Sequence, residues 1–194
     1  MSHLMMNIGT LLIVAAFGVQ LSLLLKPPYR WLAMACLVLL SVILPVAGTK
    51  PWLWINGAVG ELSVVTMILL TGFILRNLTG FSLTGSYTRV HIYLVIFIAG
   101  LLLFPATLGL TQFDPYSLGY SFELSLLLLA LSIFYWLFQQ RHLAVILLIV
   151  VAADEIGILS SNNSWDYLID PLLWIISPVM LVIMYAARRT STTK

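Results

Sequence analysis

Seven apolar runs, each close to the length of a membrane-spanning helix, follow one another along the 194 residues of this chain. A helix needs about 20 residues to cross about 30 Å of hydrocarbon, so seven crossings leave room for short loops and tails alone. The runs cover approximately residues 5–25, 31–46, 54–75, 90–110, 120–138, 143–159 and 171–187. The pattern predicts an all-α, polytopic transmembrane bundle of about seven helices that forms one domain over residues 1–194.

Composition supports a lipid environment. Hydrophobic residues make up 61% of the chain and charged residues 8%, whereas a soluble domain carries about 25% charged residues. A chain with so few charges cannot cover a water-facing surface, so the lipid bilayer is its expected partner. The net charge is +2 and the sequence has no dense Lys/Arg run, which argues against nucleic-acid binding.

Two of the runs are less regular than the others. No Lys or Arg precedes the first run, so we interpret it as a retained helix and not as a cleaved signal peptide. A bundle of six helices that lacks this run is the main alternative topology. The sixth run is purely apolar only from Leu143 to Ala153. To cross a membrane it must continue as a helix through Asp154 and Glu155 to about Leu159.

The cations predict the orientation of the chain. With the N-terminus outside, eight of the nine Lys and Arg residues fall in cytoplasmic loops or in the C-terminal tail, and only Lys50 falls outside. Cytoplasmic loops of membrane proteins carry an excess of Lys and Arg. We therefore expect a cytoplasmic C-terminus and, as the location, the cytoplasmic (inner) membrane.

The carboxylates show the opposite distribution, because in this topology all seven lie in the outer half of the spans or in the outer loops. A charged side chain at the centre of a spanning helix costs about 2.5–3.5 kcal/mol on insertion scales and normally faces a partner inside the bundle. Outer cations are scarce here, so we expect the acids within spans to be protonated, hydrated or bound to a cation. The hypothesis is an outward-facing cation or proton site built from Glu61, Glu123, Asp154 and Glu155. The alternative is that these residues only pack helices together or lie in interfacial water.

The remaining polar residues give weaker signals. Asp114, Asp166 and Asp170 are interpreted as ordinary solvated loop residues, and His91 and His142 lie near the opposite, cytoplasmic ends of their spans. Acids and histidines are thus separated, so no zinc-type cluster and no cofactor are expected.

Three classes of function stay open for the chain. It is a small carrier or channel-type subunit that handles a cation or proton, a non-catalytic accessory subunit that associates with other membrane subunits, or a membrane-embedded enzyme that acts on a lipid or lipid-linked substrate. No hydrolase elbow, phosphate-binding loop or metalloprotease motif is present in the sequence, which makes the enzyme the least favoured class.

Overall fold

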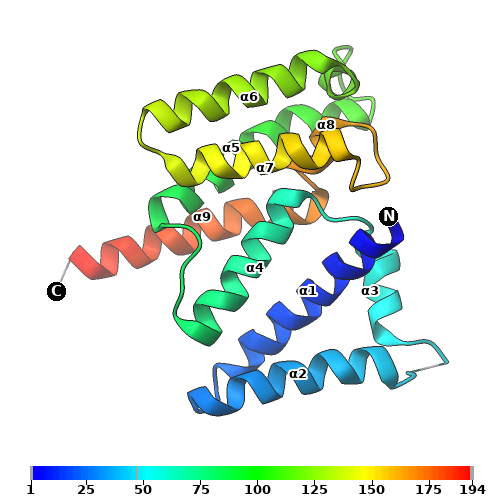
Figure 1. Ribbon diagram of the computed structural model, residues 1–194, viewed down its shortest axis with the longest axis vertical. Helices are drawn as coiled ribbons and strands as arrows, with labels where there is room; N and C mark the ends of the chain where they lie inside the picture. The colour runs from blue at the N-terminus through cyan, green and yellow to red at the C-terminus, as the bar shows by residue number, and fades with distance from the viewer. Residues whose placement is uncertain (1, 47, 193–194) are drawn as a thin grey trace. The chain divides into compact units, whose positions relative to one another are not determined.

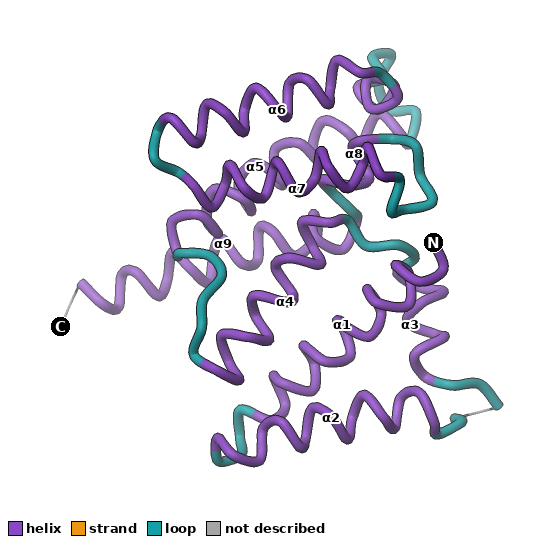
Figure 2. Tube along the Cα trace, viewed as in Figure 1, coloured by secondary structure: helices purple, strands orange, loops and turns teal. Residues whose placement is uncertain are grey.

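The computed structural model describes residues 2–46 and 48–192 of the chain. Within these ranges the regular elements are helices joined by short loops, together with an isolated bridge between Val46 and Thr49 (Figure 2). The prediction of an all-α protein is confirmed. The chain divides into two compact units. Unit 1 contains residues 1–62, 66–83 and 158–160, and unit 2 contains residues 63–65, 84–157 and 161–194. The prediction of a single membrane domain stays a prediction.

Unit 1 is built on a helical hairpin. Its helices are α1 (Ser2–Ser22), α2 (Pro27–Ile43), α3 (Pro51–Val59) and most of α4 (Val64–Thr79). Helix α1 packs closely along α2, because Gly18 has no side chain where the Cα of Met34 approaches. A Cβ at Gly18 would lie 3.3 Å from that Cα. Small residues allow this kind of close helix packing in membrane proteins.

The third apolar run differs from its prediction. One continuous helix over residues 54–75 is wrong, because the chain forms α3 and α4 with a break at residues 60–63. Gly60 adopts a φ of 71°, a left-handed conformation that glycine adopts without steric cost and that ends the first helix. Glu61 therefore lies in an unwound segment between two helices.

Unit 2 contains the other helices. They are α5 (Ser86–Thr107), the short 3₁₀ helix η1 (Pro115–Tyr120), α6 (Phe122–Leu137), α7 (Arg141–Ile156), α8 (Ser164–Leu168) and α9 (Pro171–Thr192). Helices α6 and α7 form a hairpin and lie side by side (Figure 1). Helix α7 contains both Asp154 and Glu155, as predicted. Its predicted continuation to about Leu159 is wrong, because Gly157 follows in the left-handed conformation and ends the helix at Ile156.

The second close contact of unit 2 joins α5 to α9. The indole of Trp174 lies against the backbone of α5 at Gly100, where a Cβ would come within 2.2 Å of its Cδ1. The same indole donates a hydrogen bond of 3.3 Å to the carbonyl of Phe97 and has its ring centroid 4.7 Å from that of Phe104. One tryptophan thus fixes α9 against α5.

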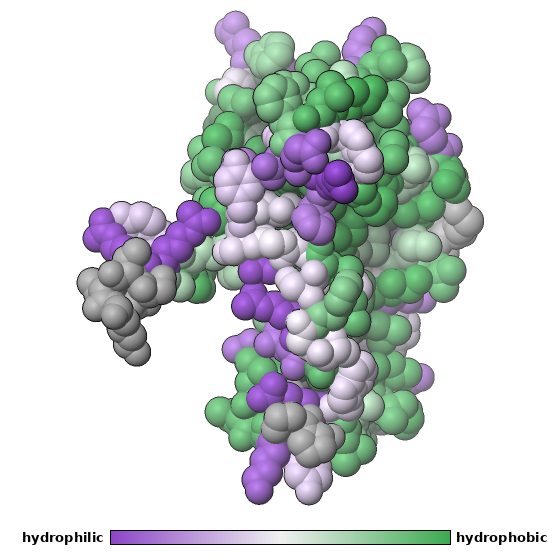
Figure 3. All heavy atoms as spheres, turned by 60° about the vertical axis from the view of Figure 1, so that its left-hand side comes forward, coloured by the Kyte–Doolittle hydropathy of each residue, from purple (hydrophilic) through white to green (hydrophobic). Residues whose placement is uncertain are grey.

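The surface of the described chain is strongly apolar. Large side chains such as Leu102 and Ile175 are 64% and 63% exposed, and apolar side chains cover much of the face seen in Figure 3. Among the described residues, three helices are long and apolar enough to cross a membrane, namely residues 4–22, 86–107 and 171–189, and residues 29–43, 64–79 and 122–137 form shorter apolar helices. The predicted number of seven spans and the orientation of the termini stay predictions.

Candidate functional site

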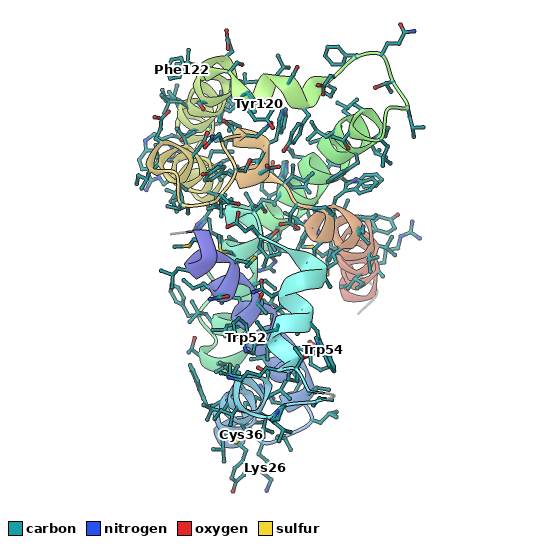
Figure 4. The ribbon with its side chains drawn as sticks, turned by 90° about the vertical axis from the view of Figure 1, so that its right-hand side faces the viewer. Lys26, Cys36, Trp52, Trp54, Tyr120 and Phe122 are labelled. Carbon is teal, nitrogen blue, oxygen red and sulfur yellow. The ribbon has the colours of Figure 1, made fainter. Side chains whose placement is uncertain are left out.

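A polar cleft of about 310 Å³ opens in unit 2 where α7 ends and α6 begins. Its walls also include η1, α8 and part of the loop between α7 and α8. The lining residues are Gly119, Tyr120, Ser121, Phe122, Ser125, Asp154, Glu155, Gly157, Ser161, Asn162, Ser164 and Tyr167. Tyr120 and Phe122 lie at the junction of η1 and α6 (Figure 4). The cleft contains two of the four acids that the sequence assigned to a site.

Asp154 is the centre of a small hydroxyl cluster in this cleft. Its Oδ2 accepts a hydrogen bond of 2.5 Å from Oγ of Ser164 and one of 3.3 Å from Oγ of Ser125, and the two serine hydroxyls are 3.3 Å apart. The three residues come from α7, α8 and α6. Both serines are buried, so Asp154 joins three helices through hydroxyl groups that are themselves shielded from water.

Glu155 follows Asp154 in the same helix but has a different environment. Successive residues of an α-helix point about 100° apart, and the Glu155 side chain is exposed whereas that of Asp154 is partly buried. The cleft therefore has one carboxylate held by hydroxyls at its wall and one that is open to solvent.

The described lining of the cleft has acidic side chains and no basic ones. None of the described residues that line it is a Lys, Arg or His. The donors that reach Asp154 are hydroxyls, which share hydrogen bonds but bring no compensating charge. Two carboxylates line the cleft and no described lining residue is basic. Such a distribution of charge favours cations over anions.

A second hydroxyl–carboxylate cluster fixes the loop that borders the cleft. The hydroxyl of Tyr116 lies 2.9 and 2.8 Å from the two carboxylate oxygens of Asp166, and Oγ of Ser161 donates to Oδ2 at 2.5 Å. Desolvation, followed by the hydrogen bond to Asp166, raises the pKa of the Tyr116 phenol above its ordinary value of 10.0. Tyr116 therefore keeps its proton and donates a hydrogen bond that ties η1 to α8.

Asn163 is a buried, hydrogen-bonded residue of the same loop. Its side chain is fully buried. Its Oδ1 accepts from the backbone N–H of Trp165 at 2.9 Å, and its Nδ2 donates to the carbonyl of Tyr116 at 3.0 Å. Gly119 lies against this amide, where a Cβ would come within 1.8 Å of Oδ1. Asn163 thus begins α8 as an N-cap and holds η1 in place at the same time.

Glu61 belongs to unit 1 and has a separate environment there. Ser160 donates to its Oε2 through both the backbone N–H, at 2.8 Å, and the hydroxyl. Glu123 stands in the first turn of α6 and is absent from the cleft lining. The structure therefore brings Asp154 and Glu155 into one cleft, and it places Glu61 and Glu123 outside that lining.

Asp170 corrects one interpretation made from the sequence. It is 5% exposed and is not a solvated loop residue. Its Oδ1 accepts from the backbone N–H of Leu173 at 2.8 Å, at the start of α9, and its Oδ2 accepts from that of Ser63 at 2.9 Å. The signal was in the sequence, because Asp followed by Pro171 before an apolar run is a typical helix start. Asp114 caps η1 in a similar way but on the exposed surface.

The hydroxyl groups of the site were missed in the sequence. Ser160, Ser161 and Ser164 stand in one short segment, and each donates to a different carboxylate. The run Ser160–Ser164 was interpreted only as a polar loop, although Ser and Asn are the residues that bond carboxylates and cap helices.

Two further findings concern metal-type clusters and known proteins. Among the described residues, no group of three or more His, Cys, Asp or Glu side chains is arranged to hold a metal ion. Comparison of the chain with protein-family models, with curated proteins and with solved structures finds no match.

Proposed function

We propose that this chain is a small multi-pass protein of the cytoplasmic membrane that handles a cation or proton at the cleft formed by Asp154 and Glu155. The observation that carries the proposal is the hydroxyl-bound carboxylate of Asp154 in a cleft that lacks a basic lining residue. Protein sites for hard cations are built from carboxylate and carbonyl oxygens and water. Acids within membrane spans commonly mark ion and proton pathways.

The proposed topology places this cleft on the outer side. It has seven spans, the N-terminus outside and the C-terminus in the cytoplasm, because this orientation puts eight of the nine Lys and Arg residues on the cytoplasmic side. In this arrangement the C-terminal end of α7 faces outward, so the cleft opens toward external water. The ion would then enter from outside without crossing the apolar part of the bundle.

The break between α3 and α4 supports the same functional class. Membrane carriers often bind their ions beside discontinuous helices, where unwound backbone and half-helix ends supply ligands. Glu61 lies in such an unwound segment and is held by Ser160. We propose Glu61 as a second polar position in the carrier, separate from the primary site at Asp154.

Ion binding is tested by thermal unfolding of the detergent-solubilised protein. A ligand that binds only the folded state raises the melting temperature. The melting temperature is measured in NaCl, KCl and CaCl₂ against choline chloride of equal ionic strength, and as a function of pH. We expect the cation or pH dependence of the wild type to be lost in Asp154→Asn and retained in Glu123→Gln, which removes an acid outside the cleft. Identical dependences in wild type and Asp154→Asn would contradict the proposal.

A further inference from the structure

A second cavity in unit 2 has a different chemical character from the cleft. It has a volume of about 190 Å³ and lies between α5, α6 and α7, with Trp165 and Leu168 of α8 also in its lining. The lining is formed mostly by Leu, Ile and Val side chains. A cavity with so apolar a lining favours an apolar occupant over water.

The lining includes the polar side chains of His91, Tyr135 and Trp165, and the indole N–H of Trp165 is already bonded to the carbonyl of Pro115. Helices α5 and α6 line it in opposite directions, with His91, Val95 and Ala99 in chain order on α5 and Leu124, Leu131 and Tyr135 on α6. His91 and Tyr135 come from the start of α5 and the end of α6, beside Leu143 in the first turn of α7. The lining therefore changes from apolar to polar along its length, as an amphiphile requires.

Two arginines stand in the first turns of α5 and α7, near this end, and neither is among the lining residues. Arg141 opens α7 two residues before the lining residue Leu143, and its guanidinium lies 5.8 Å from the ring centroid of Trp136, the neighbour of Tyr135. Arg89 stands in the first turn of α5, where its guanidinium donates to the carbonyl of Thr84 at 2.8 Å. No Asp or Glu is among the described lining residues. The charge at this end is complementary to an anionic group.

We infer that this cavity is a binding site for an anionic phospholipid, with an acyl chain between α5, α6 and α7 and the phosphate beside Arg141. The volume holds part of one chain and not a whole lipid, so the headgroup stays outside, at the basic end. Basic pockets between membrane helices on the cytoplasmic side are known to bind anionic headgroups. The site is separate from the Asp154 cleft, because the two linings share no residue.

The site is tested by native mass spectrometry of the delipidated protein with dioleoyl phosphatidylglycerol and dioleoyl phosphatidylcholine, which have the same chains. Ala99 lines the cavity, whereas Ile98 on the same helix is 51% exposed and does not line it. We expect the wild type to retain the anionic lipid several-fold more than the zwitterionic one. Ala99→Phe fills the cavity and should lose the bound lipid, and Ile98→Phe is the matched control that should keep it.

The headgroup and chain contributions are separated by a third variant. Arg141→Gln should keep a bound lipid but lose the preference for phosphatidylglycerol. If Ala99→Phe does not fold, Ala99→Leu makes the same test with a smaller side chain. Equal retention of the two lipids by the wild type, or unchanged lipid binding in the filled variant, would overturn the inference.

Discussion

Ser164 donates a hydrogen bond of 2.5 Å to Oδ2 of Asp154, the carboxylate oxygen that Ser125 also approaches at 3.3 Å. The bond joins the first residue of α8 to the last turn of α7. It leaves Asp154 with hydroxyl partners in a cleft whose described lining has no basic side chain. The position of this carboxylate is thus fixed by neutral hydroxyl groups.

Gly119→Ala should destabilise unit 2. The added methyl group would overlap the side chain of Asn163, which is fully buried and bonded on both sides. Overpacking at such a site costs about 1–3 kcal/mol. Thermal unfolding measures the loss. Gly85→Ala is the matched control in the same unit, because nothing lies within 4 Å of its added Cβ, and its melting temperature should stay close to that of the wild type. Equal melting temperatures for the two variants would count against the packing described.

Asn163→Asp should also destabilise the fold, for a different reason. The new carboxylate still caps α8, but it loses the Nδ2 donor and places an oxygen against the carbonyl of Tyr116. An unsatisfied buried group costs about 1–3 kcal/mol. Asn162→Asp makes the same chemical change at an exposed neighbour and should be almost neutral. Denaturant unfolding of the two variants checks the difference, and a similar loss in both would show that Asn163 is not the structural residue of the loop.

The phenol of Tyr116 should resist ionisation. Its pKa is raised in the folded protein by desolvation and by Asp166, whereas an unfolded tyrosine titrates near a pKa of about 10. A raised folded-state pKa gives stability that is complete below the unfolded pKa and is lost as pH rises from it toward the folded pKa. Wild type should therefore lose more stability than Tyr116→Phe above about pH 10. Ultraviolet titration tests the cause, and a tyrosinate signal near pH 10 that Tyr116→Phe removes would refute it.

The sequence predicted the helical class and most helix positions because apolar runs between polar breaks determine them directly. It correctly continued α7 through Asp154 and Glu155. It did not predict the break at residues 60–63, because apolar runs end at Val59 and resume at Val64 and the φ of 71° at Gly60 is a conformational property. The hydrophobic pattern indicates whether a segment lies in lipid or in water. It does not show where the helix is interrupted within that segment.

The sequence pointed to some of the residues that line the cleft and not to others. Asp154 and Glu155 were found because acids are rare within apolar spans. The hydroxyls of Ser125 and Ser164 were not, because they reach the carboxylate from positions 29 and 10 residues away. Asp170 was placed in solvent, although its use as a helix cap buries it. Tertiary contacts decide the roles of these residues, and the polarity of a single residue does not predict such contacts.

Ion uptake by proteoliposomes tests the central claim most directly. Purified protein is reconstituted in vesicles, and uptake of protons and of Na⁺ is followed for wild type, Asp154→Asn and Glu123→Gln. The account predicts that wild-type vesicles take up one of these ions faster than protein-free vesicles, that Asp154→Asn abolishes the difference, and that Glu123→Gln retains it. Wild-type vesicles no faster than protein-free ones for either ion, or Asp154→Asn vesicles as fast as the wild type, would contradict it.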